Sequence, residues 1–229
     1  MSAAATGRVA AIIPAAGSGA RLGADVPKAF LALGGLSLLT RSALAMSVIA
    51  DVIIVAAPAD ALDEASTQLA HVDAETHIVA GGEHRLESVA NALRMVPEDV
   101  TIVLVHDAAR PLVPIEVIQS VVAAVRSGAK AVIPVLPLVD TIKRVNNQGI
   151  AIETVDRNQL RRVQTPQGFD RVTLDLAYSN PEVVATDDAG LMDALGIPVQ
   201  TVAGDERALK ITTMSDVQYA LSLLEATSE

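Results

Sequence analysis

The chain has 229 residues, of which 51% are hydrophobic, and a formal net charge of −10. This length is sufficient for one large α/β domain, 1–229, with a substantial core. The negative charge and the 2% aromatic content argue against a nucleic-acid partner, because such binders rely on basic surfaces or stacking side chains.

The absence of cysteine excludes disulfides, thiolate nucleophiles and Cys-ligated zinc, and it fits a reducing compartment. No apolar run approaches the roughly 20 residues that a membrane helix needs, and residues 9–20 are too broken by Gly and Pro for a signal peptide. We therefore expect a cytoplasmic protein without a membrane partner.

The first predicted element is a strand at 9–13, which Pro14 ends and which leads into a loop of small residues. Small residues let backbone N–H groups approach phosphate oxygens closely. Arg21 and Lys28 add positive charge that the amides lack. The candidate nucleotide-binding residues of this loop are Pro14, Ala15, Ala16, Gly17 and Gly19.

Three loop types compete for this stretch, beside an ordinary strand-to-helix turn. A Rossmann fingerprint would need a third glycine where Leu22 stands. A P-loop would need Gly before its lysine and Ser or Thr after it, whereas Pro27 and Ala29 flank Lys28. The AAGxGxR…PK loop of nucleotidyltransferases is present in full, so we favour it.

Continuous apolar strands then alternate with helices. The pattern predicts a helix at 36–48, strands at 51–57, 76–80, 101–107 and 129–135, and a helix at 114–128 between the last two. Asp60 can cap the helix after the second strand. Such strands indicate a mostly parallel sheet covered by helices on both faces.

Residues 138–165 interrupt this rhythm with two short β-like runs around a turn at 146–149. We expect a hairpin, an arm at approximately 138–158, which has few large apolar residues for its own core and therefore projects and packs on something else. Helices near 170–178, 187–195 and 215–225 and a strand near 198–203 complete the chain.

Polar residues that follow apolar strands are the candidates for chemistry, because ligands of open parallel sheets bind at the carboxyl ends of strands. Asp107 could meet a phosphate-bound Mg²⁺ or simply cap a turn. Arg110 could bind an anion. His106 is better interpreted as a packed, hydrogen-bonded histidine. Gly81 and Gly82 would admit a base, with the Ser88 hydroxyl reading its edge.

At this point the chain resembles the 2-C-methyl-D-erythritol 4-phosphate cytidylyltransferase family. The matching motifs cover essentially the whole chain in order: IIPAAGSGARLG, PKAF, GGEHRLESV, VHDAARP, VDRNQL, TPQGF, TDDAG and LKIT. The resemblance implies a Rossmann-like nucleotidyltransferase fold whose projecting β-arm forms a homodimer. It also implies transfer of CMP from CTP to methylerythritol phosphate in isoprenoid precursor biosynthesis, with Mg²⁺ as cofactor.

The resemblance assigns roles residue by residue. Arg21 and Lys28 would hold the CTP phosphates as catalytic residues, and Asp107 would lie near the metal. Cytidine would contact Ala15, Ala16, Gly82 and Ser88, with Ala108 close by. The acceptor phosphate would be positioned by Arg157 and Lys210, also catalytic, in a site lined by Arg110, Thr141, Thr165 and Thr186.

One departure from the family pattern is Ala208, where Asn is often found two residues before the matched lysine. The acidic partner of Lys210 would then be Asp205 or Glu206. The chain ends soon after the last helix, so we expect no second enzyme fused to it.

The implied nucleophile is a phosphate monoester oxygen, which is largely ionised at neutral pH because its second pKa is about 6. No general base is required, so positioning and electrostatics should carry the rate. An alternative is a ribitol-5-phosphate cytidylyltransferase, which shares much of this pattern. A non-catalytic nucleotide-binding regulator is disfavoured by the joint presence of Arg21, Lys28 and Asp107, and a dehydrogenase by the failed Rossmann spacing.

Overall fold

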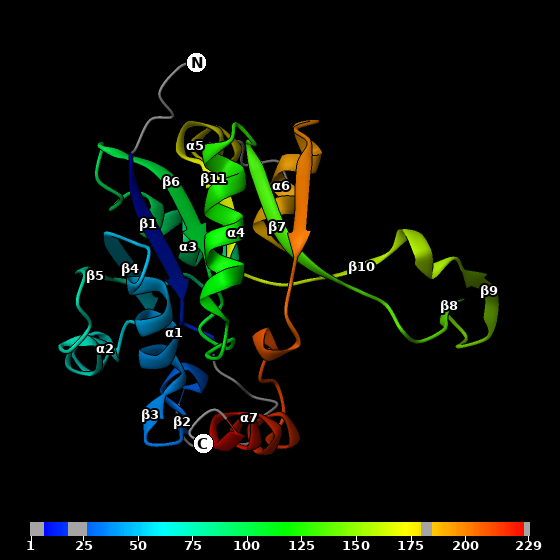
Figure 1. The fold of residues 1–229 in the computed structure, drawn as a ribbon, viewed down its shortest axis with the longest axis horizontal. Coiled ribbons are helices and arrows are strands. Elements are labelled where there is room, and N and C mark those ends of the chain that lie inside the picture. The colour runs from blue at the N-terminus through cyan, green and yellow to red at the C-terminus, as the bar shows by residue number, and fades with distance from the viewer. Residues whose placement is uncertain (1–6, 18–26, 180–184, 227–229) are drawn as a thin grey trace.

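The computed structural model describes residues 7–17, 27–179 and 185–226. Within these residues the chain forms a central sheet with the strand order β10-β7-β11-β6-β1-β4-β5, and β12 pairs with β7 (Figure 1). The sheet strands are β1 (Arg8–Pro14), β4 (Val52–Ala57), β5 (Glu75–Ala80), β6 (Val100–Val105), β7 (Ala131–Pro137), β10 (Arg161–Val163), β11 (Gln167–Asp170) and β12 (Val199–Ala203).

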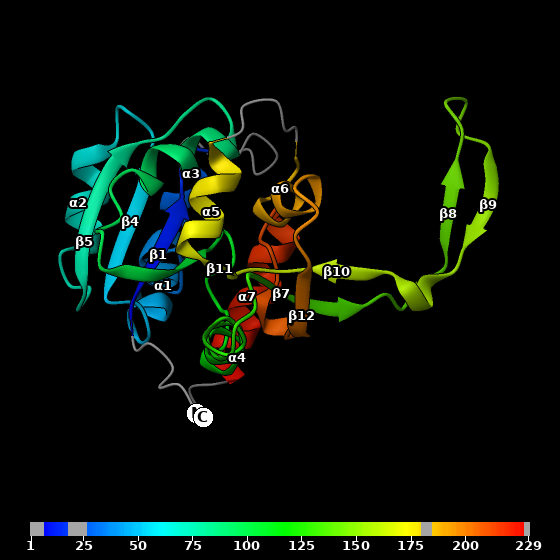
Figure 2. The same cartoon turned by 90° about the horizontal axis from the view of Figure 1, so that it is seen from above.

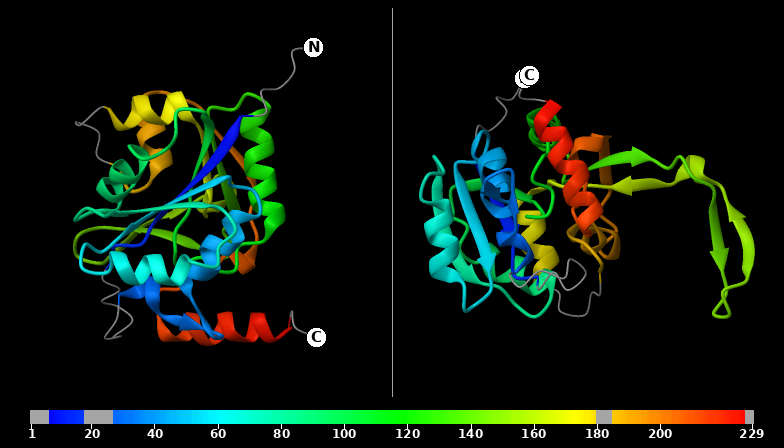
Figure 3. Two further views of the ribbon diagram at one scale, coloured as in Figure 1. Left: turned by 90° about the vertical axis from the view of Figure 1, so that its left-hand side faces the viewer. Right: turned by 90° about the horizontal axis from the view of Figure 1, so that it is seen from below.

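Helices cover both faces of this sheet, as the sequence predicts. They are α1 (Leu38–Ser47), α2 (Leu62–Leu69), α3 (Arg85–Leu93), α4 (Ile115–Arg126), α5 (Arg171–Tyr178) and α6 (Asp188–Ala194), whereas α7 (Met214–Ala226) packs in a separate small core. One hydrophobic core joins α1, α2 and α4 to one face, and a second joins α3, α5 and α6 to the other (Figure 3).

The continuous apolar strands arise because the sheet is buried on both sides. Along β1, Ala11 and Ile13 enter the first core while Ala10 and Ile12 enter the second. Since neighbouring side chains in a strand point to opposite faces, a strand between two helical layers needs apolar residues at every position. The six residues of β4 are all buried for the same reason.

The sheet is mostly parallel, with two short antiparallel strands that the sequence does not indicate. β1 runs parallel to β4 and β6, whereas β11 pairs antiparallel with β6 and β7, and β10 pairs antiparallel with β7. The β11 residue Gly168 lies directly under α4, where an added Cβ would sit 2.4 Å from a Val121 methyl group. Glycine therefore lets this helix approach the sheet.

A small third core supports the end of the chain. It gathers Leu33, Leu38 and Ile211 with the α7 residues Val217 and Ala220. Leu33 belongs to a short antiparallel pair, β2 (Ala32–Leu33) and β3 (Leu36–Ser37), that the sequence also leaves unpredicted.

Two expectations about helix starts have different outcomes. α4 begins after Pro114 and is followed by Gly128 at a φ of 109°, as predicted. The predicted Asp60 cap is wrong, because Ala61 occupies the N-cap of α2 and no side chain caps that helix.

The predicted arm is a two-stranded antiparallel hairpin, β8 (Ile142–Val145) and β9 (Ala151–Val155), that extends away from the body (Figure 2). Its turn is closed by the Asn146 side chain, which accepts hydrogen bonds from the Gln148 and Ile150 amides. Val145, Ile150 and Ile152 are each more than half exposed on it.

In the described part of the chain, no helix has the length and apolar content needed to cross a membrane.

Candidate active site

A cleft lies at the carboxyl ends of β1, β5 and β6, where the sequence places its candidate ligand-binding loops. Most predicted nucleotide-binding residues line it, together with Lys28 and Lys210. Its walls are Pro14, Ala15, Ala16, Gly17, Lys28, Ala29, Gly82, Glu83, His84, Arg85, Ser88, Asp107, Ala108, Ala109 and Lys210.

The first wall is the beginning of the phosphate-loop candidate. The Ala15 amide donates to the Ala56 carbonyl at 2.8 Å, which extends the β1–β4 pairing into the loop. Residues 18–26, which include the predicted Gly19 and Arg21, lie outside the described residues. Lys28 is the first residue of a short 3₁₀ helix, Lys28–Phe30, and lines the cleft. The other two residues of this helix, Ala29 and Phe30, are buried and anchor it to the domain.

The second wall is the turn after β5, and close packing explains its glycines. A Cβ on Gly81 would lie 2.5 Å from the Ala16 Cβ and 2.9 Å from the Ser88 hydroxyl. The two loops can therefore meet only where residue 81 has no side chain. The Ser88 hydroxyl accepts from the Gly82 amide at 3.1 Å and lies 3.1 Å from the His84 carbonyl, so in this structure it braces the turn.

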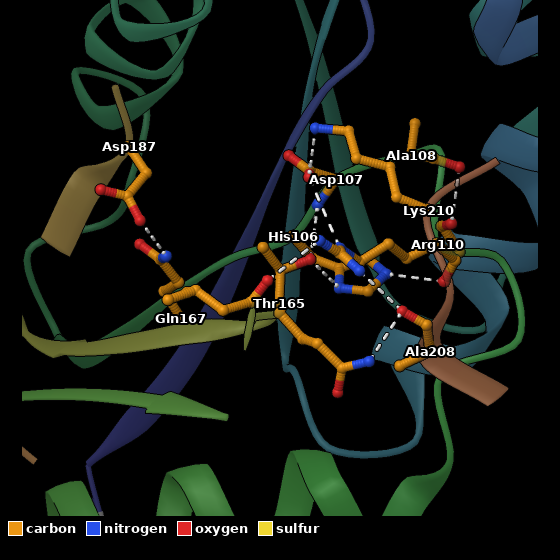
Figure 4. A network of polar contacts seen from close by, with 12 residues as sticks. His106, Asp107, Ala108, Arg110, Thr165, Gln167, Asp187, Ala208 and Lys210 are labelled. Atoms are coloured by element: carbon orange, nitrogen blue, oxygen red, sulfur yellow. Dashed lines mark hydrogen bonds and ion pairs between the residues drawn. The ribbon is translucent and has the colours of Figure 1, made fainter. Parts of the chain in front are cut away.

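The third wall is the end of β6, where His106 and Thr165 hold the backbone of Asp107 in place (Figure 4). The Asp107 amide donates to the Thr165 hydroxyl oxygen at 3.1 Å, and that hydroxyl lies 3.1 Å from Nδ1 of His106. Nε2 of His106 lies 3.1 Å from the Arg110 carbonyl oxygen, which can only accept. His106 therefore carries its proton on Nε2, and Thr165 donates to Nδ1.

This arrangement needs a neutral imidazole. His106 is fully buried, and burial lowers its pKa to about 4 against the opposing influence of Asp107. The interpretation of His106 as a packed, hydrogen-bonded residue is confirmed. Thr165 is 4% exposed, so its hydroxyl serves this network in the present structure.

The Asp107 carboxylate is surrounded by three cations. Arg85 Nε lies 3.1 Å from Oδ1, while Lys210 Nζ and Arg110 Nε lie 2.9 and 3.6 Å from Oδ2. Burial opposes ionisation of Asp107, but Arg85 and then Lys210 outweigh it and hold its pKa well below the usual range. The cleft thus contains a permanent carboxylate within a local excess of positive charge.

The loop that presents Lys210 is held by buried polar contacts. Arg110 Nη1 donates to the Ala208 carbonyl at 2.7 Å, and the Gln164 side-chain amide donates to the Asp205 carbonyl at 2.8 Å. The Ile211 amide donates to the Ala109 carbonyl at 2.8 Å. Ala208 is fully buried, so the position that departs from the family pattern serves through its backbone.

The expectation that Asp205 or Glu206 is the acidic partner of Lys210 is wrong. Lys210 pairs with Asp107, whereas Asp205 pairs with Arg207 and Glu206 with Arg162.

The remaining predicted acceptor residues are not gathered in this cleft. Thr141 and Arg157 lie on the arm and are exposed; Arg157 belongs to the 3₁₀ helix Arg157–Gln159 and donates to the Val139 carbonyl. Arg110 does not line the cleft but contacts Asp107 and the Ala208 carbonyl beside it. Thr186 is exposed just before α6, on a segment that Gln167 fastens to the sheet through Asp187.

Sequence reasoning missed Arg85 and Asp188 as a pair. Arg85 Nη1 contacts Asp188 Oδ2 at 2.7 Å across 103 residues of sequence. Asp188 precedes an apolar helix, so its pattern indicates a capping residue, and that role belongs to its neighbour Asp187, which accepts from the Gly190 amide. In the sequence, the signal for such a pair is limited to a basic residue, Arg85, in the polar GGEHR loop.

The described residues contain no cluster of three His, Cys, Asp or Glu that could cage a metal ion. They do fit a Mg²⁺ ion held mainly by phosphates, because such ions take only one or two carboxylates from the protein. Asp107 is the buried carboxylate of the cleft and could serve this purpose.

Comparison with known proteins identifies relatives along the whole chain. Residues 9–226 match the family model described as IspD: 2-C-methyl-D-erythritol 4-phosphate cytidylyltransferase. Proteins of that name from Frankia casuarinae and Saccharopolyspora erythraea are 49% and 48% identical to this chain; the matches cover 95% and 94% of it and 81% and 99% of the relatives.

Solved structures agree with the sequence comparison. The crystal structure of 4-diphosphocytidyl-2C-methyl-D-erythritol synthase from Anaerococcus prevotii superposes with a TM-score of 0.83 at 28% identity, covering 96% of this chain and 99% of that one. The Thermus thermophilus 2-C-methyl-D-erythritol 4-phosphate cytidylyltransferase gives 0.80 at 35% identity, covering 95% and 99%.

Proposed function

The chain belongs to the 2-C-methyl-D-erythritol 4-phosphate cytidylyltransferase family, and from this membership we infer that CTP and the acceptor phosphate meet in the cleft around Asp107. The protein is a cytidylyltransferase of isoprenoid precursor biosynthesis. The observation that carries the assignment of the site is the convergence of Arg85, Arg110 and Lys210 on one strand-end carboxylate, in a cleft that Lys28 also lines.

The nucleotide occupies the side of the cleft formed by the first two loops. Ala15 and Ala16 of one loop and Gly82 of the other line this side, and their small size leaves room for a base and its ribose. Lys28, which lines the cleft, faces the triphosphate, and the sequence motif assigns Arg21 to the same phosphates. The acceptor lies on the side of Lys210 and of Thr186.

Catalysis rests on holding two anions together against their repulsion. An oxygen of the acceptor phosphate attacks the α-phosphorus of CTP, a P–O bond forms, and the bond to the β-phosphate breaks to release pyrophosphate. The nucleophile is already ionised at neutral pH, so no side chain has to remove a proton. Both nitrogens of His106, the histidine nearest Asp107 in sequence, are already engaged in hydrogen bonds.

Mg²⁺ bound to the triphosphate would neutralise charge and help pyrophosphate to leave. Asp107 would be the protein carboxylate that holds this ion. Lys210, which pairs with Asp107 at 2.9 Å, would position the acceptor phosphate.

The arm supplies the second half of the site in a homodimer. A lone two-stranded hairpin is marginally stable in water, and this one exposes Val145, Ile150 and Ile152. A second copy would cover these side chains. Arg157 lies in the arm, which extends away from the cleft of its own body (Figure 2), so it would complete the acceptor site of the partner.

The experiment that tests the function is pyrophosphate release from CTP and Mg²⁺ with each candidate acceptor. Methylerythritol phosphate should support rapid release, and ribitol 5-phosphate should support far less. Equal or faster release with ribitol 5-phosphate would contradict the acceptor assignment. Tight CTP binding without release for any acceptor would instead favour a nucleotide-binding regulator.

A further inference from the structure

Arg85 joins two carboxylates that come from different elements, Asp107 after β6 and Asp188 at the start of α6. Its Nε contacts Oδ1 of Asp107 at 3.1 Å, and its Nη1 contacts Oδ2 of Asp188 at 2.7 Å. A planar guanidinium can make both contacts at once with a fixed spacing, which an ammonium group cannot. Arg85 therefore sets the distance between the end of β6 and the start of α6.

Asp188 is sealed inside the protein and fully partnered there. Its side chain is 0% exposed, and its other oxygen, Oδ1, accepts from the Tyr178 hydroxyl at 2.5 Å. Burial and then the charge of Asp188 raise the pKa of Tyr178, which stays a hydrogen-bond donor. Asp188 thus cannot touch a substrate, yet it stands two residues after the exposed Thr186.

A second set of contacts fixes the same segment to the sheet. The Gln167 side chain donates to Asp187 Oδ2 at 2.8 Å and accepts from the Ala189 amide at 3.0 Å. These two hydrogen bonds hold the segment on β11. The Arg85 contact differs from them because it leads to Asp107, at the nucleotide side of the cleft.

We propose that Arg85 is a positioning residue that, through Asp188, holds the Thr186 segment at the correct distance from Asp107 and so determines how well the acceptor binds. The inference rests on the proposed function in one respect, namely that Thr186 lies in the acceptor site. The consequence is that a buried carboxylate behind the cleft controls acceptor affinity without contacting the acceptor.

The test is Asp188→Asn, which keeps the side-chain shape and leaves the Arg85–Asp107 pair in place. The KM for methylerythritol phosphate should rise on the order of tenfold, the scale of coupling between linked sites. The kcat at saturating acceptor and the Kd for CTP, measured by calorimetry without acceptor, should stay within about twofold. Arg85→Lys is the second variant and should raise the same KM, because an ammonium group lacks the rigid fork of donors that fixes the spacing of the two carboxylates.

Tyr178→Phe is the matched control. It removes a hydrogen bond from the same carboxylate, on the side away from Arg85, and should lower thermal stability while leaving the acceptor KM within about twofold. The inference is overturned if Tyr178→Phe raises the KM as much as Asp188→Asn does, or if folded Asp188→Asn has an unchanged acceptor KM. Absence of pyrophosphate release by the wild-type protein would instead contradict the proposed function.

Discussion

At the scale of single residues, the cleft is organised by the way three cations share one carboxylate. Arg85, Arg110 and Lys210 all lie within 3.6 Å of Asp107, and this attraction gathers their positive charge at the end of β6. Positive groups that are fixed before the substrates arrive need little reorganisation during the reaction. Asp107 is therefore as important for placing these cations as for any contact with metal.

The first prediction at this scale concerns Lys28. Lys28→Ala should lower kcat about 10²- to 10³-fold, the usual effect of removing one group that stabilises developing charge. The measurement is steady-state pyrophosphate release, with circular dichroism to verify folding. Lys130→Ala is the matched control, because Lys130 is exposed at the amino end of β7 and pairs with Asp170. Near-normal turnover in folded Lys28→Ala would remove Lys28 from the reaction.

The second prediction concerns Asp107. Asp107→Asn should raise the Mg²⁺ concentration needed for half-maximal activity several-fold, because a neutral amide oxygen is a weaker ligand for Mg²⁺ than a carboxylate. Asp175→Asn serves as the control, since Asp175 pairs with Arg171 on α5 and does not line the cleft. Identical Mg²⁺ titrations for the wild type and Asp107→Asn would show that Asp107 does not assist the metal.

At the scale of elements, the arm is a well-formed hairpin although its own contacts are too weak to stabilise it. β8 and β9 pair only with each other, and the Arg144–Glu153 ion pair and the Lys143–Thr154 hydrogen bond between them are exposed. Exposed pairs of this kind contribute at most about 1 kcal/mol. Contact with a second copy would explain why the hairpin is nevertheless formed.

The prediction for the arm uses mixed dimers of Lys28→Ala and Arg157→Ala subunits. Each variant should be inactive as a homodimer. If Arg157 completes the partner's site, one site of the mixed dimer carries both defects and the other carries none, so about half of the wild-type activity should return. If Arg157 acts within its own subunit, both sites stay defective.

Differently tagged subunits allow the mixed dimer to be purified before the pyrophosphate assay. A confirmed mixed dimer without recovered activity would reject the shared site and leave the cytidylyltransferase assignment intact. A protein that sediments as a monomer at assay concentration while fully active would contradict the role of the arm.

At the scale of the whole molecule, the cleft sits where two hydrophobic cores meet the end of the sheet. Residues at its base are buried, and their ionisation is therefore coupled to the global free energy of unfolding. His106 is the main case, because burial lowers its pKa from 6.5 to about 4. The unfolded chain binds a proton at this residue below pH 6.5 while the folded protein does not.

The sign of this linkage predicts that acid destabilises the protein in a defined window. Between pH 6.5 and about 4 the unfolded state binds more protons, so the free energy of unfolding should fall as the pH falls, by about 3 kcal/mol in total. The strongly depressed pKa of Asp107 adds a further loss only below its ordinary value of 3.8. Urea denaturation at a series of pH values measures the slope.

His106→Gln provides the control for this prediction, because glutamine can still donate one hydrogen bond and accept another but cannot take up a proton in this range. It should be less stable at pH 7 and show a flatter profile between pH 6.5 and 4.5. The exposed histidines are common to both proteins and cancel in the difference. Parallel profiles would show that His106 does not govern the acid response.

Elements whose signals are local can be predicted from the amino-acid sequence alone. Five continuous apolar strands, the Pro114 start of α4, the Asn146 turn of the arm and the polar strand ends that form the cleft could all be predicted. These features depend on side-chain periodicity and backbone preferences within a few residues, and such signals are readable without the fold. The motif order also sufficed to indicate the family.

Pairings between residues far apart in the sequence depend on the tertiary structure. β11 became a strand because β6 and β7 flank it, although its four residues carry no strand pattern. Asp107, rather than a sequence neighbour, became the partner of Lys210, and Arg85 met Asp188 across 103 residues. Charge pairing of this kind depends on which loops converge at the sheet edge. The distances between those loops cannot be obtained from the linear sequence.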